Sequence, residues 1–374
     1  MLKPHENDRI TRVGPGTPMG NLMRSYWQPA ALAEELPEDG GPPLRVRLLG
    51  EDLLAFRDAE GDVLLATEPA WNAPQKAYFT WEGGGIVWAY MGPASRLPAP
   101  PNYEVVRVPA THRAATKNHQ SCNWLQVIEG AVDSVHFGFL HNTDITAKAM
   151  YSPVPTIEFE KTDHGLIGAA IHQLGDGKTY ARTFHFVMPA HSIRGRTRAW
   201  NGEMEKVPHV SGQIAVPIDD EHTWLYSYIY SQTSGVPMSD EFVRARWAAA
   251  GRGPGDVMPG YRLKASMEND YFVDRRLQKT KSFSGIPGVN TQDVAIQEGM
   301  GAILDRSKEH LAVTDRVIIA ARQLLLEAID AVERGETPRG LDPASYAGIR
   351  GGDLIVSSDA DWREALRGEL VAKF

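Results

Sequence analysis

Hydrophobic and polar residues alternate in short runs through the first part of the chain, a pattern typical of β-strands with one buried face. Three stretches between residues 43 and 92 show it: "PLRVRLLG", "EDLLAFRDAEGDVLLA" and "AYFTWEGGGIVWAYMG". The second and third predict hairpins that turn at residues 59–62 and 83–85, where glycine allows a tight turn. Residues 1–43 are expected to be rich in loops. The proline-rich stretch 96–110 predicts a seam between a small β unit and a larger domain.

Helical spacing of apolar residues appears in the second half of the chain, most clearly at 313–334, where Thr314 is the expected N-cap and Gly335 the stop. Further helices are expected near 122–140, 240–250, 267–278 and 291–303. Strand-like segments are expected at 156–172, 180–195 and 212–230. Because strands and helices are segregated rather than alternating, the pattern predicts an α+β fold with an antiparallel sheet.

The predicted helix at 122–140 has two different faces. Apolar residues at helical spacing predict one face toward the core: Trp124, Val127, Ile128, Ala131 and Val135. Polar residues follow a second face: Gln126, Glu129, Asp133 and His136. No Lys or Arg lies between residues 121 and 147 to balance the acids. Such a face needs a bound cation, or it lies in an interface.

His136 and His141 lie in the same stretch, "EGAVDSVHFGFLH". Their spacing would place them about 140° apart around an ideal helix. Both can bind one metal ion only if the helix ends or bulges between them, and Gly138 is the expected position of that break. The spacing alone leaves two interpretations open, a metal site or a helix end with two hydrogen-bonded histidines.

The segment "NWLQVIEGAVDSVHFGFLH" resembles the mononuclear-iron motif of Rieske-type non-haem iron oxygenases, in the branch around the phthalate 4,5-dioxygenase oxygenase component. Other segments resemble that branch in the same order over nearly the whole chain, among them "TRVGPGTPMGNLMRSYWQPA", "GGIVWAYMGP" and "GIPGVNTQDVAIQEGMGAILDRSKEHL". The resemblance implies that His136 and His141 bind Fe(II) and that Asp293 is the third ligand. Two histidines and one carboxylate leave coordination positions open, as non-haem Fe(II) oxygenases require.

Asp293 has competitors for this role. Asp293 lies at the start of a predicted helix, where an acidic side chain is stabilised by the helix dipole without binding a metal. Other carboxylates distant from the two histidines are also candidates: Asp219, Asp220, Asp270 and Asp274.

The resemblance also implies an architecture. Residues 101–374 are expected to form a helix-grip catalytic domain, in which a long helix lies in a curved antiparallel sheet. Residues 1–100 are expected to form a truncated, β-rich remnant of a Rieske domain. Family members carry a Cys-x-His and a Cys-x-x-His motif there, but "GDVLLATEPAWNAPQKAY" runs directly from one strand to the next. The chain has one cysteine, Cys122, whereas a Rieske [2Fe-2S] centre needs two Cys and two His, so no cluster is expected in this chain.

Charge and hydropathy exclude several classes of partner. The chain has 374 residues and a net charge of -8, with no block of Lys and Arg, so neither nucleic acid nor an anionic membrane is an expected partner. Apolar runs end well short of the ~18 residues that a spanning helix needs. The N-terminus, "MLKPHENDRI", has no apolar signal core. A cytoplasmic enzyme is expected.

Glu129 and Asp133 are the expected catalytic residues beside the three ligands. In the family, the counterpart of Asp133 links the iron site to the cluster of a neighbouring subunit within a trimer, so the resemblance implies a homotrimer or a multiple of trimers. Asp133 could instead only orient His136.

Three functions stay open. The first is an oxygenase that hydroxylates or O-demethylates a small aromatic substrate, with electrons from a separate Rieske or ferredoxin protein and its reductase. The second is a redox-neutral hydrolase or lyase that uses the same three ligands, with Zn(II) as an acceptable metal. The third is a non-catalytic partner subunit. The complete set of ligands favours the first two.

Overall fold

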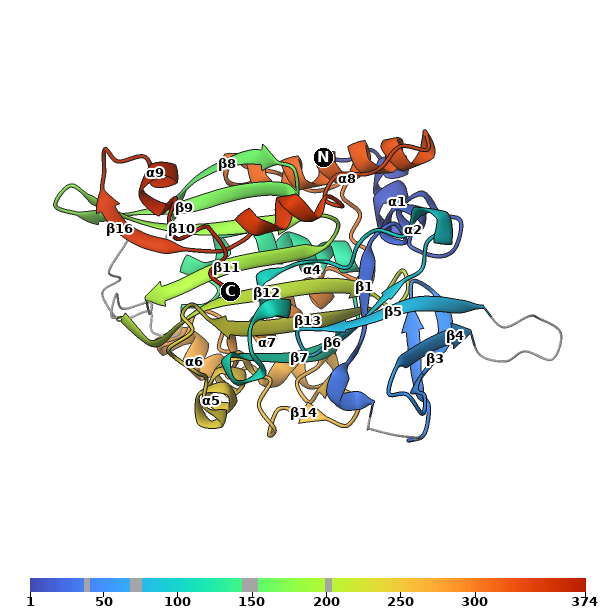
Figure 1. The fold of residues 1–374 in the computed structure, drawn as a ribbon. Coiled ribbons are helices and arrows are strands. Elements are labelled where there is room, and N and C mark those ends of the chain that lie inside the picture. Colours follow the sequence, from blue (N-terminus) through green and yellow to red (C-terminus); the bar gives the residue numbers. More distant parts are fainter. Residues whose placement is uncertain (37–40, 68–75, 143–153, 199–203) are drawn as a thin grey trace.

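The computed structural model describes residues 1–36, 41–67, 76–142, 154–198 and 204–374. Two antiparallel sheets lie beside each other, and the helices pack around the larger one (Figure 1). The six-stranded sheet has, in spatial order, β1 (Trp27–Leu32), β6 (Ile86–Tyr90), β5 (Ala77–Gly83), β4 (Val63–Thr67), β3 (Glu51–Arg57) and β2 (Leu44–Leu48).

The eight-stranded sheet has, in spatial order, β7 (Arg113–Gln120), β13 (Thr223–Ser231), β12 (Met204–Pro217), β11 (His191–Arg198), β10 (Lys178–Val187), β9 (Gly165–Gly175) and β8 (Thr156–Thr162), with β16 (Asp353–Ser357) also paired to β10. Two short strands form a separate pair, β14 (Val257–Met258) and β15 (Arg262–Leu263). The helices are α1 (Pro4–Thr11), α2 (Pro18–Met23), α3 (Glu104–Arg107), α4 (Trp124–Val132), α5 (Asp240–Ala250), α6 (Arg275–Thr280), α7 (Val289–Gly299), α8 (Arg316–Glu333) and α9 (Trp362–Leu366). The segregated α+β arrangement agrees with the prediction.

The two predicted hairpins of the smaller sheet are present. β3 and β4 flank the turn at 58–62, and β5 and β6 flank the turn at 84–85, where Gly84 and Gly85 both have positive φ angles. In β2 the inward Val46 is buried and the arginines on either side point to solvent, as the alternating pattern predicts. The stretch 68–75, which belongs to the segment without cluster motifs, lies outside the described residues.

Residues 1–43, expected to be rich in loops, contain more regular structure than the sequence pattern predicts. They contain α1, α2 and β1. α1 and α2 each begin at a proline, and the Thr17 hydroxyl accepts a hydrogen bond from the backbone N–H of Gly20 at the start of α2. β1 shows no alternation in its sequence because five of its six residues are buried, so both of its faces meet other parts of the protein.

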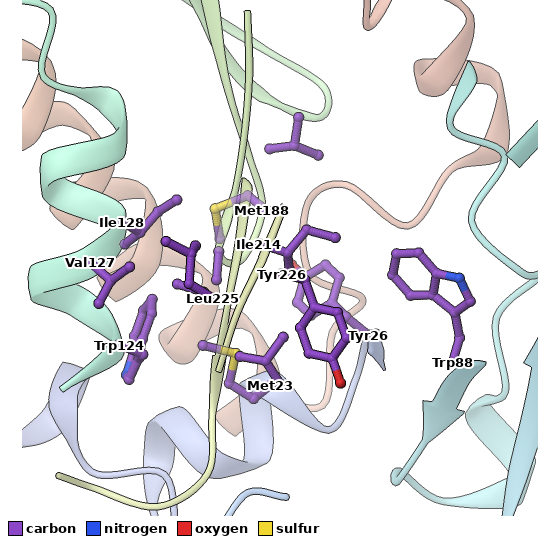
Figure 2. Packing of buried hydrophobic residues seen from close by; sticks show 14 of the residues in the cluster. Met23, Tyr26, Trp88, Trp124, Val127, Ile128, Met188, Ile214, Leu225 and Tyr226 are labelled. Atoms are coloured by element: carbon purple, nitrogen blue, oxygen red, sulfur yellow. The ribbon is translucent and has the colours of Figure 1, made fainter. Parts of the chain in front are cut away.

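The core lies on both faces of the larger sheet. Figure 2 shows Trp124, Val127 and Ile128 of α4 on one side of its strands, and Tyr26 and Trp88 on the other. Neighbouring residues of β13 contribute to opposite faces, since Leu225 points toward α4 and Tyr226 points away from it. One continuous hydrophobic cluster therefore joins α4, the larger sheet and the N-terminal strands.

The predicted helices differ from the observed ones mainly at their ends. α5 matches the prediction, and α8 carries the predicted buried stripe, although Asp315 rather than Thr314 occupies the N-cap position. α7 ends at Gly299, before the predicted residue 303. No described helix has both the length and the apolar character needed to cross a membrane.

The predicted continuous helix at 267–278 is wrong. Residues Met267–Phe272 form 3₁₀ turns interrupted by left-handed backbone at Asp270 and Tyr271, and α6 begins only at Arg275. The Tyr271 hydroxyl donates a hydrogen bond to Glu298 of α7 at 2.5 Å. This tertiary contact draws the side chain inward and outweighs the local helical tendency.

Candidate metal centre

The helix that carries Glu129 ends earlier than predicted, at Val132, because Asp133 turns the chain. Asp133 has an extended backbone, and its carboxylate accepts hydrogen bonds from the N–H groups of Val135 at 2.9 Å and His136 at 3.3 Å. Such a turn competes directly with helical hydrogen bonding. The break expected at Gly138 is therefore wrong, because both histidines follow the helix, with His136 opening a 3₁₀ turn.

Three predicted ligand residues come together at this turn. The Nε2 atom of His136 lies 3.4 Å from Oδ1 of Asp293, and Nε2 of His141 lies 3.3 Å from the same oxygen. One donor atom from each residue lies within 4.8 Å of the others. Two donors on one metal ion with bonds of about 2.1 Å lie no more than roughly 4.2 Å apart, and both imidazole-to-carboxylate distances meet this condition. Two imidazoles and one carboxylate are the donor set that leaves positions open on a non-haem Fe(II) ion.

Each of the two imidazoles is fixed by a hydrogen bond at its Nδ1 atom. His136 Nδ1 lies 2.9 Å from Oδ2 of Asp133, and His141 Nδ1 lies 2.8 Å from Oε1 of Gln292. The Gln292 amide is itself oriented, since its nitrogen donates to the carbonyl of Ile286 at 2.9 Å. A partner on Nδ1 fixes the ring and directs the Nε2 lone pair toward a metal position. His136 Nε2 is buried and has no hydrogen-bond partner among the described residues.

The charges in this group support one another. Burial disfavours a charged imidazole at His136, but the hydrogen bond with Asp133 and the nearby carboxylate of Asp293 prevail and raise its pKa to about 9. Burial also opposes ionisation of Asp293, yet His141 and His136 hold its pKa below the usual range. For Asp133, the same burial effect is outweighed by the hydrogen bond with His136, and its pKa is lowered. Two carboxylates around two imidazoles favour a cation at Nε2, either a proton or a metal ion.

The competing carboxylates are used elsewhere. Asp219 pairs with His222, Asp220 accepts a hydrogen bond from the backbone of Val13, and Asp274 caps α6. Asp270 belongs to the left-handed turn before α6. Among the described residues, Asp293 is the carboxylate within reach of both histidines.

Glu129 has cationic partners, although its neighbours in the sequence include none. Its carboxylate accepts hydrogen bonds from Arg306, at 2.8 and 2.9 Å, and from Arg322, at 2.6 Å. Burial would raise the pKa of Glu129, but the two guanidinium groups keep it lowered. Arg306 lies 177 positions and Arg322 lies 193 positions after Glu129 in the sequence. The charges of the neighbouring residues therefore gave no sign of them. The geometry supports a structural role for Glu129, joining α4 to α8, rather than contact with substrate.

The variant Glu129→Gln is expected to destabilise the protein by about 3 kcal/mol, because it removes the charge that two buried arginines face. Urea unfolding at neutral pH measures the loss. Since the pKa of Glu129 is lowered in the folded protein, its contribution is present above the ordinary carboxyl pKa and disappears as the pH falls through the lowered value. The exposed pair of Glu327 with Lys161 offers a control, and Glu327→Gln should change stability by less than about 0.5 kcal/mol. Equal effects of the two variants would contradict the prediction.

A cavity of about 440 Å³ lies beside the three ligands. Its walls come from α4, from β10 to β13, and from the region of α5 and α7. Apolar and aromatic side chains share these walls with polar ones, which is the usual character of a small-molecule site. Cys122 does not line this cavity, and burial raises the pKa of its thiol, so it is a small buried residue outside the site.

Two features of this site were not identified from the sequence. Gln292 orients His141, and its position directly before Asp293 on α7 is the one local signal that could have drawn attention to it. The cavity also contains arginines from β10, β11 and the α5 region, which lie far apart in sequence. No motif links them.

The fold and the sequence both have close counterparts among known proteins. A family model described as "LigXa C-terminal domain like" matches residues 89–371. The chain is 32% identical to the phthalate 4,5-dioxygenase oxygenase subunit of Pseudomonas putida, over 97% of this chain and 94% of the relative. It is 30% identical to the 3-chlorobenzoate-3,4-dioxygenase oxygenase subunit of Comamonas testosteroni, over 98% of both chains.

Solved structures show the same fold at lower identity. A caffeine-bound variant of NdmA from Pseudomonas putida CBB5 superposes with a TM-score of 0.59 at 14% identity, covering 91% of this chain and 98% of that one. The family resemblance seen in the sequence is thus confirmed by identity over nearly the full length of two relatives. With a family model that also spans most of the chain, these matches show that the protein belongs to the Rieske-type oxygenase α-subunit family, and is an oxidoreductase.

Proposed function

We propose that His136, His141 and Asp293 bind one Fe(II) ion and that the chain is the catalytic subunit of an oxygenase acting on a small aromatic substrate. The observation that carries the proposal is the convergence of the three donor atoms, with Nε2 of both histidines directed at one carboxylate oxygen. Bound there, Fe(II) would supply the redox chemistry that activates dioxygen. The relatives are named for phthalate and 3-chlorobenzoate, which supports an aromatic acid or a related aromatic ether as substrate.

The chain's own residues would perform three tasks. Asp133 and Gln292 hold the two imidazoles in the orientation that presents Nε2 to the metal. The cavity beside the ligands would hold the substrate, with Phe137 and Trp247 in its walls offering surfaces for a planar ring. Asp133, whose backbone carbonyl and carboxylate lie at the edge of the site, would also be the point through which electrons arrive.

The electrons would come from a separate protein. One cysteine cannot provide the two thiolates of a Rieske centre, so we infer that no [2Fe-2S] cluster is carried by this chain alone. A Rieske protein or a ferredoxin with its reductase would then deliver the electrons. A homotrimer, or a multiple of trimers, remains the expected assembly, since in the family one subunit's cluster faces the next subunit's iron.

The architecture fits this proposal. α4 lies against one face of the larger antiparallel sheet, which supports a helix-grip catalytic domain at residues 101–374. The six-stranded sheet would then be the truncated Rieske-type domain at 1–100. β1 belongs to this smaller sheet and also packs near β12 of the larger one, so the two units share part of the core.

Oxygen labelling tests the proposed reaction. An oxygenase is expected to place an atom from ¹⁸O₂ in the hydroxyl group of a hydroxylated aromatic product when a donor and reductase are supplied. Mass spectrometry of the product measures the label, and unlabelled gas in H₂¹⁸O provides the control. A redox-neutral hydrolase would incorporate oxygen from water instead, and that result would reject the proposal.

A further inference from the structure

The two oxygens of the Asp293 carboxylate face different partners. Oδ1 faces the two imidazoles, since it lies 3.4 Å from Nε2 of His136 and 3.3 Å from Nε2 of His141. Oδ2 accepts a hydrogen bond from the side-chain amide of Asn290, whose Nδ2 atom is 3.2 Å away. Among the described residues, Asn290 is the donor that reaches Oδ2. The two oxygens are therefore not equivalent in the folded protein.

The chemistry of the two groups fixes the orientation of the Asn290 amide. A carboxylate that binds a metal ion is deprotonated, so Asp293 can only accept hydrogen bonds. The NH₂ end of the amide must then face Oδ2, because the carbonyl end has no hydrogen to donate. A neutral amide also leaves the negative charge of Asp293 available to a metal ion, whereas a guanidinium or ammonium group would compete with the metal for that charge.

Helix α7 brings Asn290 close to Asp293. The two residues lie three positions apart in the helix, and residues at this spacing lie on the same helix face. An asparagine near the start of a helix often caps backbone N–H groups with its side-chain oxygen. The bond made by Asn290 runs the other way, because its nitrogen donates to Asp293. The amide thus serves the carboxylate of the metal site.

A close backbone contact fixes the start of α7. Gly288, the N-cap residue, has a φ of 81° and lies against Gly251, the residue that ends α5. A Cβ atom at Gly288 would lie 2.6 Å from the Cα atom of Gly251, so the contact has no room for a side chain. The same turn of α7 carries Gln292, which orients His141. This turn therefore orients two of the three ligands, one through Gln292 and one through Asn290.

We propose that Asn290 is a positioning residue that retains Oδ2 of Asp293, so that the carboxylate binds the metal through Oδ1 alone. This inference rests on the proposed function in taking a metal ion as bound by the three ligands. A carboxylate that bound through both oxygens would occupy one further coordination position. Asn290 keeps that position open for an external ligand, beside the cavity whose wall it also forms.

The number of water molecules on a bound metal ion tests this inference without turnover. Mn(II) is a suitable probe because it favours octahedral coordination by nitrogen and oxygen donors and is visible by EPR. The broadening of its EPR signal in H₂¹⁷O reports the number of bound waters. The signal of free Mn(II) in the same spectrum shows whether all of the metal is bound.

The variant Asn290→Ala is expected to lose one metal-bound water. In the wild-type chain, octahedral Mn(II) with three protein donor atoms should hold about three waters. Without the amide, Oδ2 of Asp293 is free to bind the metal and to displace roughly one of these waters. Asn290 is half-buried, so this variant should unfold at nearly the wild-type temperature.

Two further variants separate the hydrogen bond from the size of the side chain. Val289→Ala is the matched control, because Val289 adjoins Asn290 on α7 and lines the same cavity, but its apolar side chain cannot donate to Asp293. This control should hold as many waters as the wild-type chain. Asn290→Gln keeps an amide donor, and its water count should stay closer to the wild-type value than that of Asn290→Ala.

An unchanged water count in Asn290→Ala would overturn the inference, as would an equal fall in Val289→Ala. The same spectra test the metal site separately, because the double variant with His136→Ala and His141→Ala should leave Mn(II) free. Mn(II) that stayed free with the wild-type chain would contradict the proposed metal site, and this inference with it. Mn(II) that needed both histidines but did not respond to Asn290→Ala would contradict this inference alone.

Discussion

Replacing both His136 and His141 with alanine is expected to abolish stoichiometric iron binding while leaving the fold intact. The two imidazoles supply two of three protein donors, and one carboxylate at Asp293 cannot hold Fe(II) alone. The purified wild-type protein, reconstituted anaerobically, should hold roughly one iron per chain, since a single group of three ligands is present among the described residues. Inductively coupled plasma mass spectrometry measures the metal, and circular dichroism measures the fold.

The chain provides a matched control for this experiment. His222 also lies three residues after an aspartate, and its Nδ1 atom is 2.9 Å from Asp219, as His136 Nδ1 is from Asp133. His222→Ala should therefore keep its iron. If the double variant retained a full equivalent of iron, the assignment of His136 and His141 as ligands would be contradicted.

The same samples test the inference about the cluster. Acid-labile sulfide and the visible absorption of a [2Fe-2S] centre are expected to be absent, because Cys122 is the single cysteine and is buried. Sulfide in stoichiometric amount would require a cluster shared between chains and would overturn this inference.

Turnover with dioxygen is expected to depend on an added electron-transfer protein and its reductase, with little or no product in their absence. Monooxygenation and cis-dihydroxylation both consume two electrons beyond those supplied by the substrate, and one cysteine leaves the chain without the cluster that would store one of them. Product formation and oxygen uptake are measured with the chain alone, with the donor alone and with both.

Asp133 is expected to matter for this donor-supported turnover. Asp133→Asn keeps the shape of the side chain but removes its charge beside His136, where the two side chains are 2.9 Å apart. Loss of such a supporting partner lowers activity by about 10- to 100-fold in metal enzymes, and here the iron content should change little because all three ligands remain. Asp219→Asn, in the similar pair with His222, serves as the control and should leave turnover unchanged.

Two results would contradict this account of turnover. Product formed anaerobically and without reductant would replace the oxygenase by a redox-neutral hydrolase or lyase, in which Zn(II) or Co(II) could substitute for iron. An Asp133→Asn variant that loses its iron along with its activity would make Asp133 essential to the metal site itself rather than to electron delivery.

Much of the fold could be predicted from the sequence because local patterns report which face of an element is buried. The spacing of apolar residues predicts α8, and alternation broken by glycine predicts the hairpins around Gly61 and Gly84. β1 was not predicted, because a strand that is buried on both faces lacks the alternation of apolar and polar residues.

The metal ligands were predicted in a different way. Spacing alone left His136 and His141 ambiguous, and it was the resemblance to an iron-oxygenase family that singled out Asp293. The tertiary structure then showed that α4 ends at Val132, a result of the hydrogen bonds made by the Asp133 carboxylate to the following N–H groups. A periodic pattern cannot reveal such a turn, because Asp is compatible with both a helical surface and a cap.

By itself, the sequence determined the family, the α+β class, the lack of enough cysteines for a Rieske centre and the identity of the three candidate ligands. Only the tertiary structure decided what surrounds them. It paired Glu129 with Arg306 and Arg322, placed Gln292 behind His141, and brought Arg194 and Arg252 into one cavity from different elements. The physical reason is that charges and hydrogen bonds act through space, so partners far apart in sequence leave no trace in the local spacing of residues.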